Sequence, residues 1–298
     1  MFSGLTKLFV LFSLVVSAAS AETLSLQSGD ATIFYEKELT KVAQDVIKVY
    51  PALRDELVKT LGLDADFSPE VVLVKDRDKF KRMSGSDMVI AFALPGRNLV
   101  VIDASRVYSK PFTLETTLKH ELCHLVLHRG AGSGGIPRWF DEGVCQWSSG
   151  GVAELLVDEG DKALAKAVMS ERLIALNQLE RFPEDGPRLI LAYEESKSVV
   201  EYIVSEYDRE ALLRILEYLK TGESINQSIS KSLSISSEEL EKNWREYLKR
   251  KHTWFSYVSS NLYTILFALA ALMTFYGFIR MIKKKRAYVD EEEEEGKI

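Results

Sequence analysis

The sequence predicts an α+β protein with a small mixed β-sheet in its N-terminal half, a helical C-terminal half and one C-terminal transmembrane helix. Short runs of β-branched and aromatic residues, typical of strands, lie in the first half. From residue 114 onward the apolar residues recur at steps of three and four, which indicates amphipathic helices. Near the end, residues 253–279 carry no charge and are long enough to cross a bilayer.

The composition is that of an ordinary globular protein with no nucleic-acid partner. Of its 298 residues, 46% are hydrophobic and 28% are charged, which leaves room for one substantial domain or two small ones. The formal net charge is −6, and the acidic run at residues 290–295 contributes six negative charges. The rest of the chain is therefore near neutral, and no basic face indicates binding to nucleic acid.

The N-terminus has the three parts of a secretory signal peptide at residues 1–21. One lysine precedes an apolar run at residues 8–18, and a cleavage sequence of the A-x-A type ends at Ala21. The alternative is a retained N-terminal anchor, but the apolar run is short for a bilayer span. We therefore expect cleavage after Ala21 and export of the chain that follows.

A transmembrane helix is predicted at residues 253–282, followed by a basic and acidic tail at residues 283–298. Aromatic side chains gather near both ends of the apolar stretch, as they do at membrane interfaces. Five positive charges follow the uncharged stretch and three precede it. The positive-inside rule then predicts a cytoplasmic C-terminus and an N-terminal catalytic part outside the cytoplasm, in the periplasmic or extracellular space. The alternative is a buried core helix.

Residues 22–112 are expected to form the strand-rich part of the main domain. A helix is indicated at residues 36–61, with Pro51 expected to kink it or divide it in two. The last two apolar runs flank a Pro-Gly-Arg turn and predict a β-hairpin, whose edge strand could bind an extended peptide. The predicted strands are residues 31–35, 70–75, 88–94 and 98–103.

Residues 113–250 are expected to form the helical part of the same domain. A glycine-rich loop at residues 130–135 separates the first two helices, and Pro137 suits the first position of the second. Ser236 with Glu239 resembles a capping box at the start of the last helix. The predicted helices are residues 114–128, 137–147, 161–169, 173–179, 189–207, 209–219 and 236–248.

The first of these helices contains the sequence H-E-L-C-H at residues 120–124. Its two histidines, His120 and His124, are four residues apart and therefore lie on one face of the helix. Both imidazoles can reach one Zn2+ at about 2.0–2.1 Å. Glu121 projects beside the metal, where it can take a proton from a zinc-bound water molecule. The pattern is short, so its context must distinguish a metal site from a chance match.

A catalytic zinc site needs a third protein ligand and one open position for water. His128 lies two helical turns from His120, about 12 Å along the axis, which is too far to share the ion. It suits the dipole at the helix end instead. His252 adjoins the predicted membrane span. The candidates are the adjacent carboxylates Asp141 and Glu142, although an acidic pair would also complement a helix dipole, and spacing alone favours neither.

The sequence H-E-L-C-H followed by P-R-W-F-D-E-G resembles the peptidase MA-like, gluzincin-type zinc metallopeptidases. The resemblance covers about residues 113–248, and it implies a zincin-like fold with Glu142 as the third zinc ligand. The segment A-Y-E-E-S at residues 192–196 falls in the order found in this family, which implies that Tyr193 stabilises the oxyanion of the tetrahedral intermediate. Cys145 departs from the family pattern, where alanine is common, and puts no ligand in doubt.

Together these residues predict a membrane-anchored zinc metallopeptidase that binds one Zn2+ and acts on a peptide or protein substrate. Zinc would acidify water and polarise the scissile carbonyl, and Glu121 would pass the proton to the leaving amine. Gln146 could hydrogen-bond a ligand from one turn away, and a plain surface glutamine fits the sequence equally well. The alternative is a catalytically inactive zincin-fold binding or assembly module of the cell envelope, against which the intact Glu121 argues.

The two cysteines, Cys123 and Cys145, lie within the two motifs, so their sulfurs could be close in space. An oxidising compartment permits a disulfide, and two buried free cysteines fit the sequence equally well. A single-span exported protein suggests a bacterial envelope. The glycosylation sequon at Asn226 leaves a eukaryotic source open.

Overall fold

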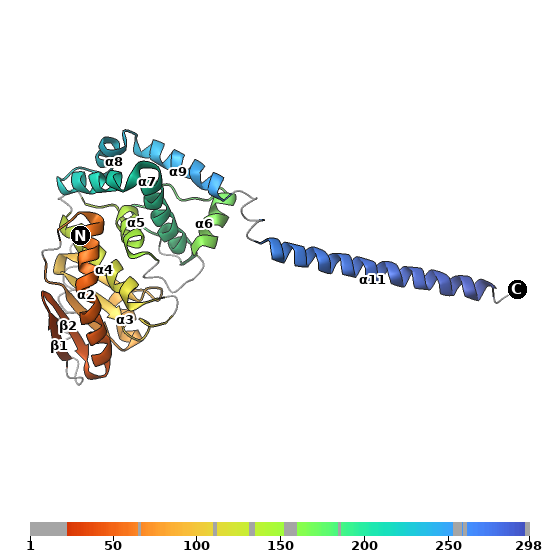
Figure 1. Ribbon diagram of the computed structural model, residues 1–298, viewed down its shortest axis with the longest axis horizontal. Coiled ribbons are helices and arrows are strands. Elements are labelled where there is room, and N and C mark those ends of the chain that lie inside the picture. Colours follow the sequence, from red (N-terminus) through yellow and green to blue (C-terminus); the bar gives the residue numbers. More distant parts are fainter. Residues whose placement is uncertain are drawn as a thin grey trace. The chain divides into compact units, whose positions relative to one another are not determined.

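The computed structural model describes residues 23–64, 67–109, 112–130, 135–151, 160–183, 186–252, 258 and 261–295. Residues 1–21, expected to form a signal peptide, lie outside this described part. The chain divides into two units, Met1–Trp244 and Arg245–Ile298. The first unit holds a mixed sheet and most of the helices, and the second holds one long apolar helix (Figure 1).

A five-stranded mixed sheet forms the N-terminal half of the first unit, in the order β1-β2-β3-β5-β4. The central strands β2, β3 and β5 run parallel, and the edge strands β1 and β4 are antiparallel to their neighbours. The strands are β1 Thr23–Ser28, β2 Ala31–Glu36, β3 Glu70–Val74, β4 Ala91–Leu94 and β5 Leu99–Asp103. The predicted hairpin is confirmed, because β4 and β5 are joined by the short turn η2 Pro95–Arg97.

β1 is missing from the sequence prediction because it lies at the edge of the sheet without a buried apolar face. None of its described side chains is buried, so its sequence carries little hydrophobic signal. β3 is the opposite case. Val71 and Leu73 lie on one face of this strand and Val72 and Val74 on the other, and a strand covered on both faces has the continuous apolar run that predicts it.

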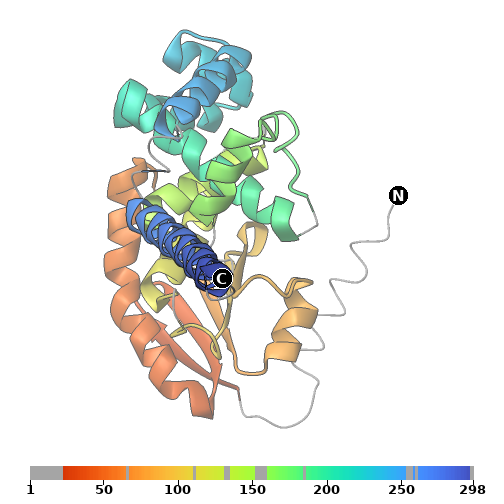
Figure 2. The ribbon, with the colours of Figure 1, turned by 90° about the vertical axis from the view of Figure 1, so that its right-hand side faces the viewer.

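The helix α2 Thr40–Leu61 is continuous through Pro51, so of the two expected alternatives, a kink or a division into two helices, the division is wrong. It follows the short turn η1 Lys37–Leu39 and lies beside the strands of the sheet (Figure 2). Pro51 is exposed, whereas Val46, Tyr50 and Leu57 are buried. Packing of this apolar face stabilises the helix despite the backbone donor that proline lacks.

The short helix α3 Arg77–Ser84 is also missing from the prediction. Phe80 is its one buried residue, so no helical period is visible in the sequence. The Asp76 side chain caps the helix by accepting a hydrogen bond from the backbone of the first turn at 2.9 Å. Phe80 packs against Val74 and Val101 of the sheet, so α3 covers part of one sheet face.

The C-terminal half of the first unit is helical, as predicted. α7 is interrupted at Asp208, with φ 69° and ψ 169°, which agrees with the two helices predicted there. The backbone N–H of Glu239 donates to Ser236 Oγ at 3.1 Å, as the predicted cap requires. The helices are α4 Leu114–Gly130, α5 Arg138–Ser149, α6 Gly160–Met169, α7 Gly186–Lys220, α8 Ile225–Leu233 and α9 Ser237–Lys251, the last crossing the unit boundary.

Two details of this half differ from the prediction. Residues 173–179 form turns instead of a helix, and the N–H of Ile174 donates to the carboxylate of Glu195 at 3.0 Å. The helix α8 was not predicted, and it begins with a capping box between Ser224 and Gln227. The sequon at Asn226 lies in this helix.

The helix α4 is central to the first unit, and its residues 117–127 are all buried. It packs against α2, β4 and β5 on one side and against α5 on the other (Figure 1). Its apolar residues Leu118, Leu122 and Val126 and its polar residues His120 and Glu121 are all at most 1% exposed. Burial of ionisable groups costs free energy unless they are paired or bind a metal, so α4 is where a functional site is expected.

In the second unit, α11 Leu262–Glu295 continues as one helix through the predicted span and into the tail. Among the described residues, Leu262–Lys283 is the one helical segment long and apolar enough to cross a membrane. Phe267 and Tyr276 are 78% and 68% exposed. The beginning of the predicted span, residues 253–257, lies outside the described residues.

A buried ion pair fixes the loop that leads into β4. Asp103, at the end of β5, is fully buried, and its Oδ2 accepts a hydrogen bond from Arg77 Nη1 at 2.9 Å. The same guanidinium donates to the carbonyl oxygens of Val89 at 2.9 Å and Asp87 at 2.6 Å. Arg77 thereby ties α3 and β5 to the segment before the edge strand.

Replacing Arg77 by methionine should lower the free energy of unfolding by about 3–5 kcal/mol, because the Asp103 carboxylate would stay buried without its partner. The control is Lys81→Met, which removes the exposed ion pair with Asp87 and should cost far less. Chemical denaturation of both variants measures the difference. Equal losses in the two would contradict the role assigned to the buried pair.

Candidate metal centre

Three buried side chains from α4 and α5 converge at one point. His120 and His124 of α4 have their Nε2 atoms 3.2 Å apart. Glu142 of α5 has its Oε2 3.5 Å from His120 Nε2 and 3.6 Å from His124 Nε2. The three residues are at most 7% exposed. Of the two adjacent carboxylates that the sequence could not separate, Glu142 is the one beside both histidines.

The triangle formed by these three atoms has the size that one tetrahedral zinc ion requires. Ligands at about 2.0–2.1 Å from zinc lie about 3.3–3.4 Å from one another at the tetrahedral angle. The Oε2 atom of Glu142 is buried and has no hydrogen-bond partner within the described part of the chain. A buried acceptor of this kind needs another partner, and a cation suits it. The two imidazole nitrogens and the carboxylate oxygen therefore fit a zinc ion, for which water would supply the fourth ligand.

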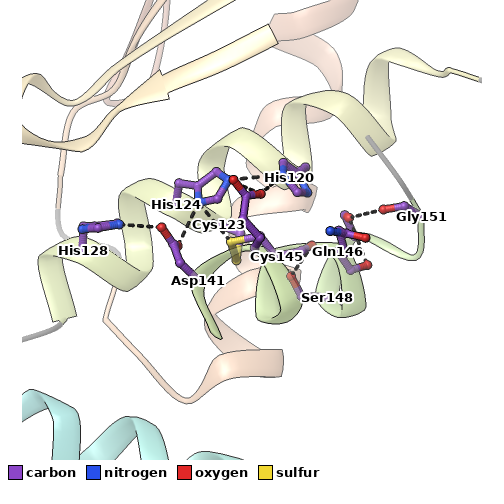
Figure 3. The surroundings of a disulfide bond; sticks show 11 residues. His120, Cys123, His124, His128, Asp141, Cys145, Gln146, Ser148 and Gly151 are labelled. Carbon is purple, nitrogen blue, oxygen red and sulfur yellow. Dashed lines mark hydrogen bonds and ion pairs between the residues drawn. A yellow bond between two sulfur atoms is a disulfide. The ribbon is translucent and has the colours of Figure 1, made fainter. Parts of the chain in front are cut away.

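Asp141 lies on the far side of His124 and bridges two histidines. Its Oδ1 is 2.8 Å from His124 Nδ1, and its Oδ2 is 2.7 Å from His128 Nε2 (Figure 3). Burial raises the pKa of Asp141, but the charges and hydrogen bonds of the two histidines outweigh this effect and lower the pKa overall. Asp141 thus holds the ring of His124 by the nitrogen that faces away from the three-atom triangle.

Sequence reasoning missed the contact between His128 and Asp141. His128 lies in the last turn of α4, as expected, and it continues the four-residue spacing that starts at His120 and His124. That spacing could have indicated a partner for a carboxylate on the facing helix.

Tyr193 of α7 lies next to the carboxylate of Glu142. Its hydroxyl donates to Glu142 Oε1 at 3.3 Å, and Arg138 Nη2 donates to the same hydroxyl at 3.4 Å. Arg138 Nε is 3.5 Å from Glu142 Oε1, and the guanidinium lies over the ring of Phe182 at 4.6 Å. Sequence reasoning missed Arg138, although it precedes Glu142 by one helical turn and therefore shares its face.

Glu121 follows His120 in the most buried part of α4 and is itself fully buried. A carboxylate in such a place is costly to ionise unless the protein or a cation stabilises it. Glu121 is thus a buried ionisable group next in sequence to one of the two histidines.

The predicted role of Gln146 is wrong. Its side chain is fully buried and its Nε2 donates to the carbonyl oxygen of Tyr193 at 3.2 Å, so it links α5 to α7 instead of supporting a ligand. Gly143 explains why α7 is so near. A Cβ atom at this position would lie 2.4 Å from the carbonyl oxygen of Ser196, so only glycine allows the two helices to approach this closely.

A cavity of about 910 Å³ adjoins the candidate metal centre. It is lined by residues of the edge strand β4 and by Phe182, Leu189 and Tyr193. His124 and Glu142 line the same cavity. β4 pairs with β5 along one edge only, so a strand-like ligand could add to its other edge.

Comparison with known proteins identifies the family. Residues 89–250, more than half of the chain, match the family model described as the Peptidase MA superfamily. The chain belongs to the Peptidase MA superfamily. This membership confirms the resemblance of the two sequence motifs, and it supports a metallopeptidase with the predicted α+β, zincin-like fold. A comparison with curated proteins finds no match.

Solved structures similar to this Peptidase MA protein include two metallopeptidases. Aminopeptidase A from Legionella pneumophila is 15% identical with a TM-score of 0.40, over 76% of this chain and 28% of that one. The M1 zinc metallopeptidase from Deinococcus radiodurans is 14% identical with a TM-score of 0.39, over 77% of this chain and 51% of that one. This chain thus spans at most about half the length of these proteins.

The two cysteines of this Peptidase MA protein form a disulfide. The sequence left a bond and two free thiols open, and the structure joins Cys123 of α4 to Cys145 of α5 with their Cα atoms 5.4 Å apart (Figure 3). The bond adjoins the candidate centre, because Cys145 Sγ is 3.6 Å from His124 Nδ1.

Replacing Gly143 by alanine should destabilise the protein by about 1–3 kcal/mol or more, because the new methyl group must displace the backbone of α7. The matched control is Gly96→Ala, where a Cβ atom has nothing within 4 Å. Thermal unfolding of the two variants gives the comparison. If Gly143→Ala unfolds at the same temperature as Gly96→Ala, the close contact between α5 and α7 does not constrain the fold.

Proposed function

We propose that this chain is a membrane-anchored zinc metallopeptidase that hydrolyses peptide bonds with one Zn2+ per chain. The observation that carries the proposal is the buried triangle of His120 Nε2, His124 Nε2 and Glu142 Oε2, with edges of 3.2, 3.5 and 3.6 Å. Membership of the Peptidase MA superfamily supports the reaction class.

His120, His124 and Glu142 would hold the ion, and Asp141 would orient one of them. When bound, zinc supplies a Lewis acid that lowers the pKa of water toward about 7 and polarises a carbonyl group. Asp141 accepts a hydrogen bond from His124 Nδ1, which keeps the proton on that nitrogen and the lone pair on Nε2. The preorganised ring needs no rearrangement to bind.

Glu121 is the proposed general base. It would accept a proton from the attacking water and return it to the leaving amine, and its complete burial keeps competing water away. Tyr193 is the proposed donor to the oxyanion that develops on the substrate. Its hydroxyl donates to Glu142 Oε1 at 3.3 Å and can turn toward the cavity that it lines, where the charge of Arg138 adds to the stabilisation.

The proposed substrate is an extended peptide or protein segment. β4 lies at the edge of the sheet and lines the cavity together with His124 and Glu142. A peptide that adds to β4 as a further strand would be held by backbone hydrogen bonds independent of its sequence, with its side chains alternating between the two walls. A peptide bond of the substrate would then lie across the triangle of His120, His124 and Glu142.

Replacing Glu121 by glutamine should leave about one zinc per chain and reduce peptide cleavage by about 10²–10⁴-fold, because only the proton acceptor is lost. Glu142→Gln should weaken zinc binding itself. The control is Glu115→Gln, an exposed glutamate on the same helix, which should change neither property. Metal analysis and cleavage of a mixture of quenched fluorescent peptides give the two readouts.

Two results would count against the peptidase. Unmodified protein that binds zinc and cleaves no peptide in this mixture would favour the catalytically inactive binding or assembly module. If the unmodified protein binds no zinc near neutral pH, both the zinc peptidase and the inactive zinc-binding module are excluded.

The proposal includes one membrane span at Leu262–Lys283, with the peptidase unit outside the cytoplasm. The segment is apolar and exposed, and five positive charges follow the uncharged stretch against three that precede it. By the positive-inside rule the tail at residues 283–298 is cytoplasmic. The sequence of residues 1–21 supports export of the other end of the chain.

Replacing both Leu266 and Leu272 by lysine in the full chain should abolish membrane retention, because a lysine within a span costs about 2.5–3.5 kcal/mol at its centre. The same two positions changed to valine form the control, which should stay in the pellet after alkaline carbonate extraction. Protease added to intact cells should remove the peptidase unit and spare a tag placed after Ile298. Loss of the tag with survival of the peptidase unit would reverse the proposed orientation.

A further inference from the structure

We propose that the Cys123–Cys145 disulfide positions Glu142 against His120 and His124, so that the affinity of the centre for zinc depends on this bond. The inference deepens the proposed function and rests on it, because zinc is the metal concerned. It concerns the one disulfide that the two cysteines of the chain can form, and that bond joins the two helices that supply the ligands.

The bond lies one helical turn from the ligands on both helices. Cys123 is three residues after His120 and directly precedes His124, and Cys145 is three residues after Glu142. Residues three apart share one face of a helix. The Cα atoms of the cysteines are 5.4 Å apart, so the sulfurs join the facing surfaces that carry the ligands (Figure 3).

The two helices are held by different parts of the fold. α4 packs against α2 and against strands β4 and β5, whereas α5 packs closely against α7. The glycine contact with Ser196 and the hydrogen bond from Gln146 to Tyr193 both fix α5 to α7. A shift of α7 relative to the sheet would therefore carry Glu142 away from the histidines. The disulfide is the covalent bond that opposes this shift.

The sequence that follows α4 is rich in glycine. Residues 130–135 read G-A-G-S-G-G, and glycine as a residue type tolerates a wide range of backbone conformations. The disulfide closes the connection between the two helices into a ring, with a sequence separation of 22 between the two cysteines. Without the bond, packing and the contacts of Asp141 with His124 and His128 would hold the third ligand in register with the first two.

The disulfide also withholds a competing metal ligand. Cys145 Sγ is 3.6 Å from His124 Nδ1, and ligand atoms of these two residues and Asp141 all lie within 4.8 Å of one another. A sulfur in a disulfide carries neither a proton nor a charge, whereas a free cysteine sulfur is a strong zinc ligand. Loss of the bond would therefore loosen Glu142 on one side of the His124 ring and create a competitor to Asp141 on the other.

The test measures the dissociation constant for zinc by competition with a chelator in the full chain. Replacing both cysteines by alanine should weaken zinc binding by about 10–100-fold, the usual effect of losing a group that positions a metal ligand. The same replacement in a Glu142→Gln background should change the constant by less than about threefold, because no third ligand remains to be misplaced. A bond that only stabilised the fold would act equally in both backgrounds.

A second measurement covers the case in which the alanine variant fails to fold. A water-soluble phosphine reduces the bond in the unmodified chain without binding zinc as a dithiol reagent does. The phosphine supplies two electrons and becomes its oxide with oxygen from water, and the two protons of that water pass to the sulfurs of Cys123 and Cys145. Zinc affinity should fall by a larger factor after this treatment in the unmodified chain than in Glu142→Gln, because the two freed thiols are present in both and only the unmodified chain has a third ligand to lose.

The possible outcomes separate this inference from the proposed function. Zinc binding by the unmodified chain that is equally tight with and without the disulfide overturns the inference and leaves the metallopeptidase intact. Equal weakening in both backgrounds also overturns it, because Glu142 is then not the residue that the bond positions. Absence of zinc binding in the unmodified, oxidised chain overturns both.

Discussion

The burial of ionisable side chains between α4 and α5 is the constraint on which the rest of this structure depends. Each ion taken out of water costs several kcal/mol unless partners replace the lost hydration. Here the partners must meet strict geometric requirements. Glu142 must lie beside the imidazole rings of both His120 and His124, and Asp141 must reach the Nδ1 atom of His124. They can do so only if α5 lies close to both of its neighbours, which is why Gly143 adjoins the backbone of α7.

The candidate metal centre lies where the sheet and the helical half of the first unit meet, and each half contributes a different part of the site. The helices supply the buried polar groups, and the sheet supplies an edge strand along which a peptide can lie. Arg77 belongs to this arrangement although it is not a ligand, because it fixes the segment before β4 through the buried Asp103 and two carbonyl oxygens. The candidate metal centre and the edge strand are thus stabilised by separate interactions.

Features that follow from periodicity within one helix or strand could be predicted from the sequence. Features that depend on the orientation in which one helix docks against another could not. The histidine pair follows from a spacing of four within a single helix. Glu142 and Asp141 differ by about 100° on their helix, so only the docking of α5 decides between them. The same docking turns Gln146 toward α7 and brings Asp141 to His128. The helix around Phe80 was missed for another reason: one buried residue creates no period.

The continuity of α11 has a geometric consequence at the membrane. Its 34 residues span about 51 Å at 1.5 Å per residue, against a hydrocarbon core of about 30 Å. If Leu262–Lys283 spans the bilayer, as proposed, the acidic run at residues 290–295 would lie about 10–18 Å farther along the axis, beyond the Debye length of about 8 Å. The helix would then act as a spacer between the lipid phosphates and this acidic run, and salt would screen the repulsion between them.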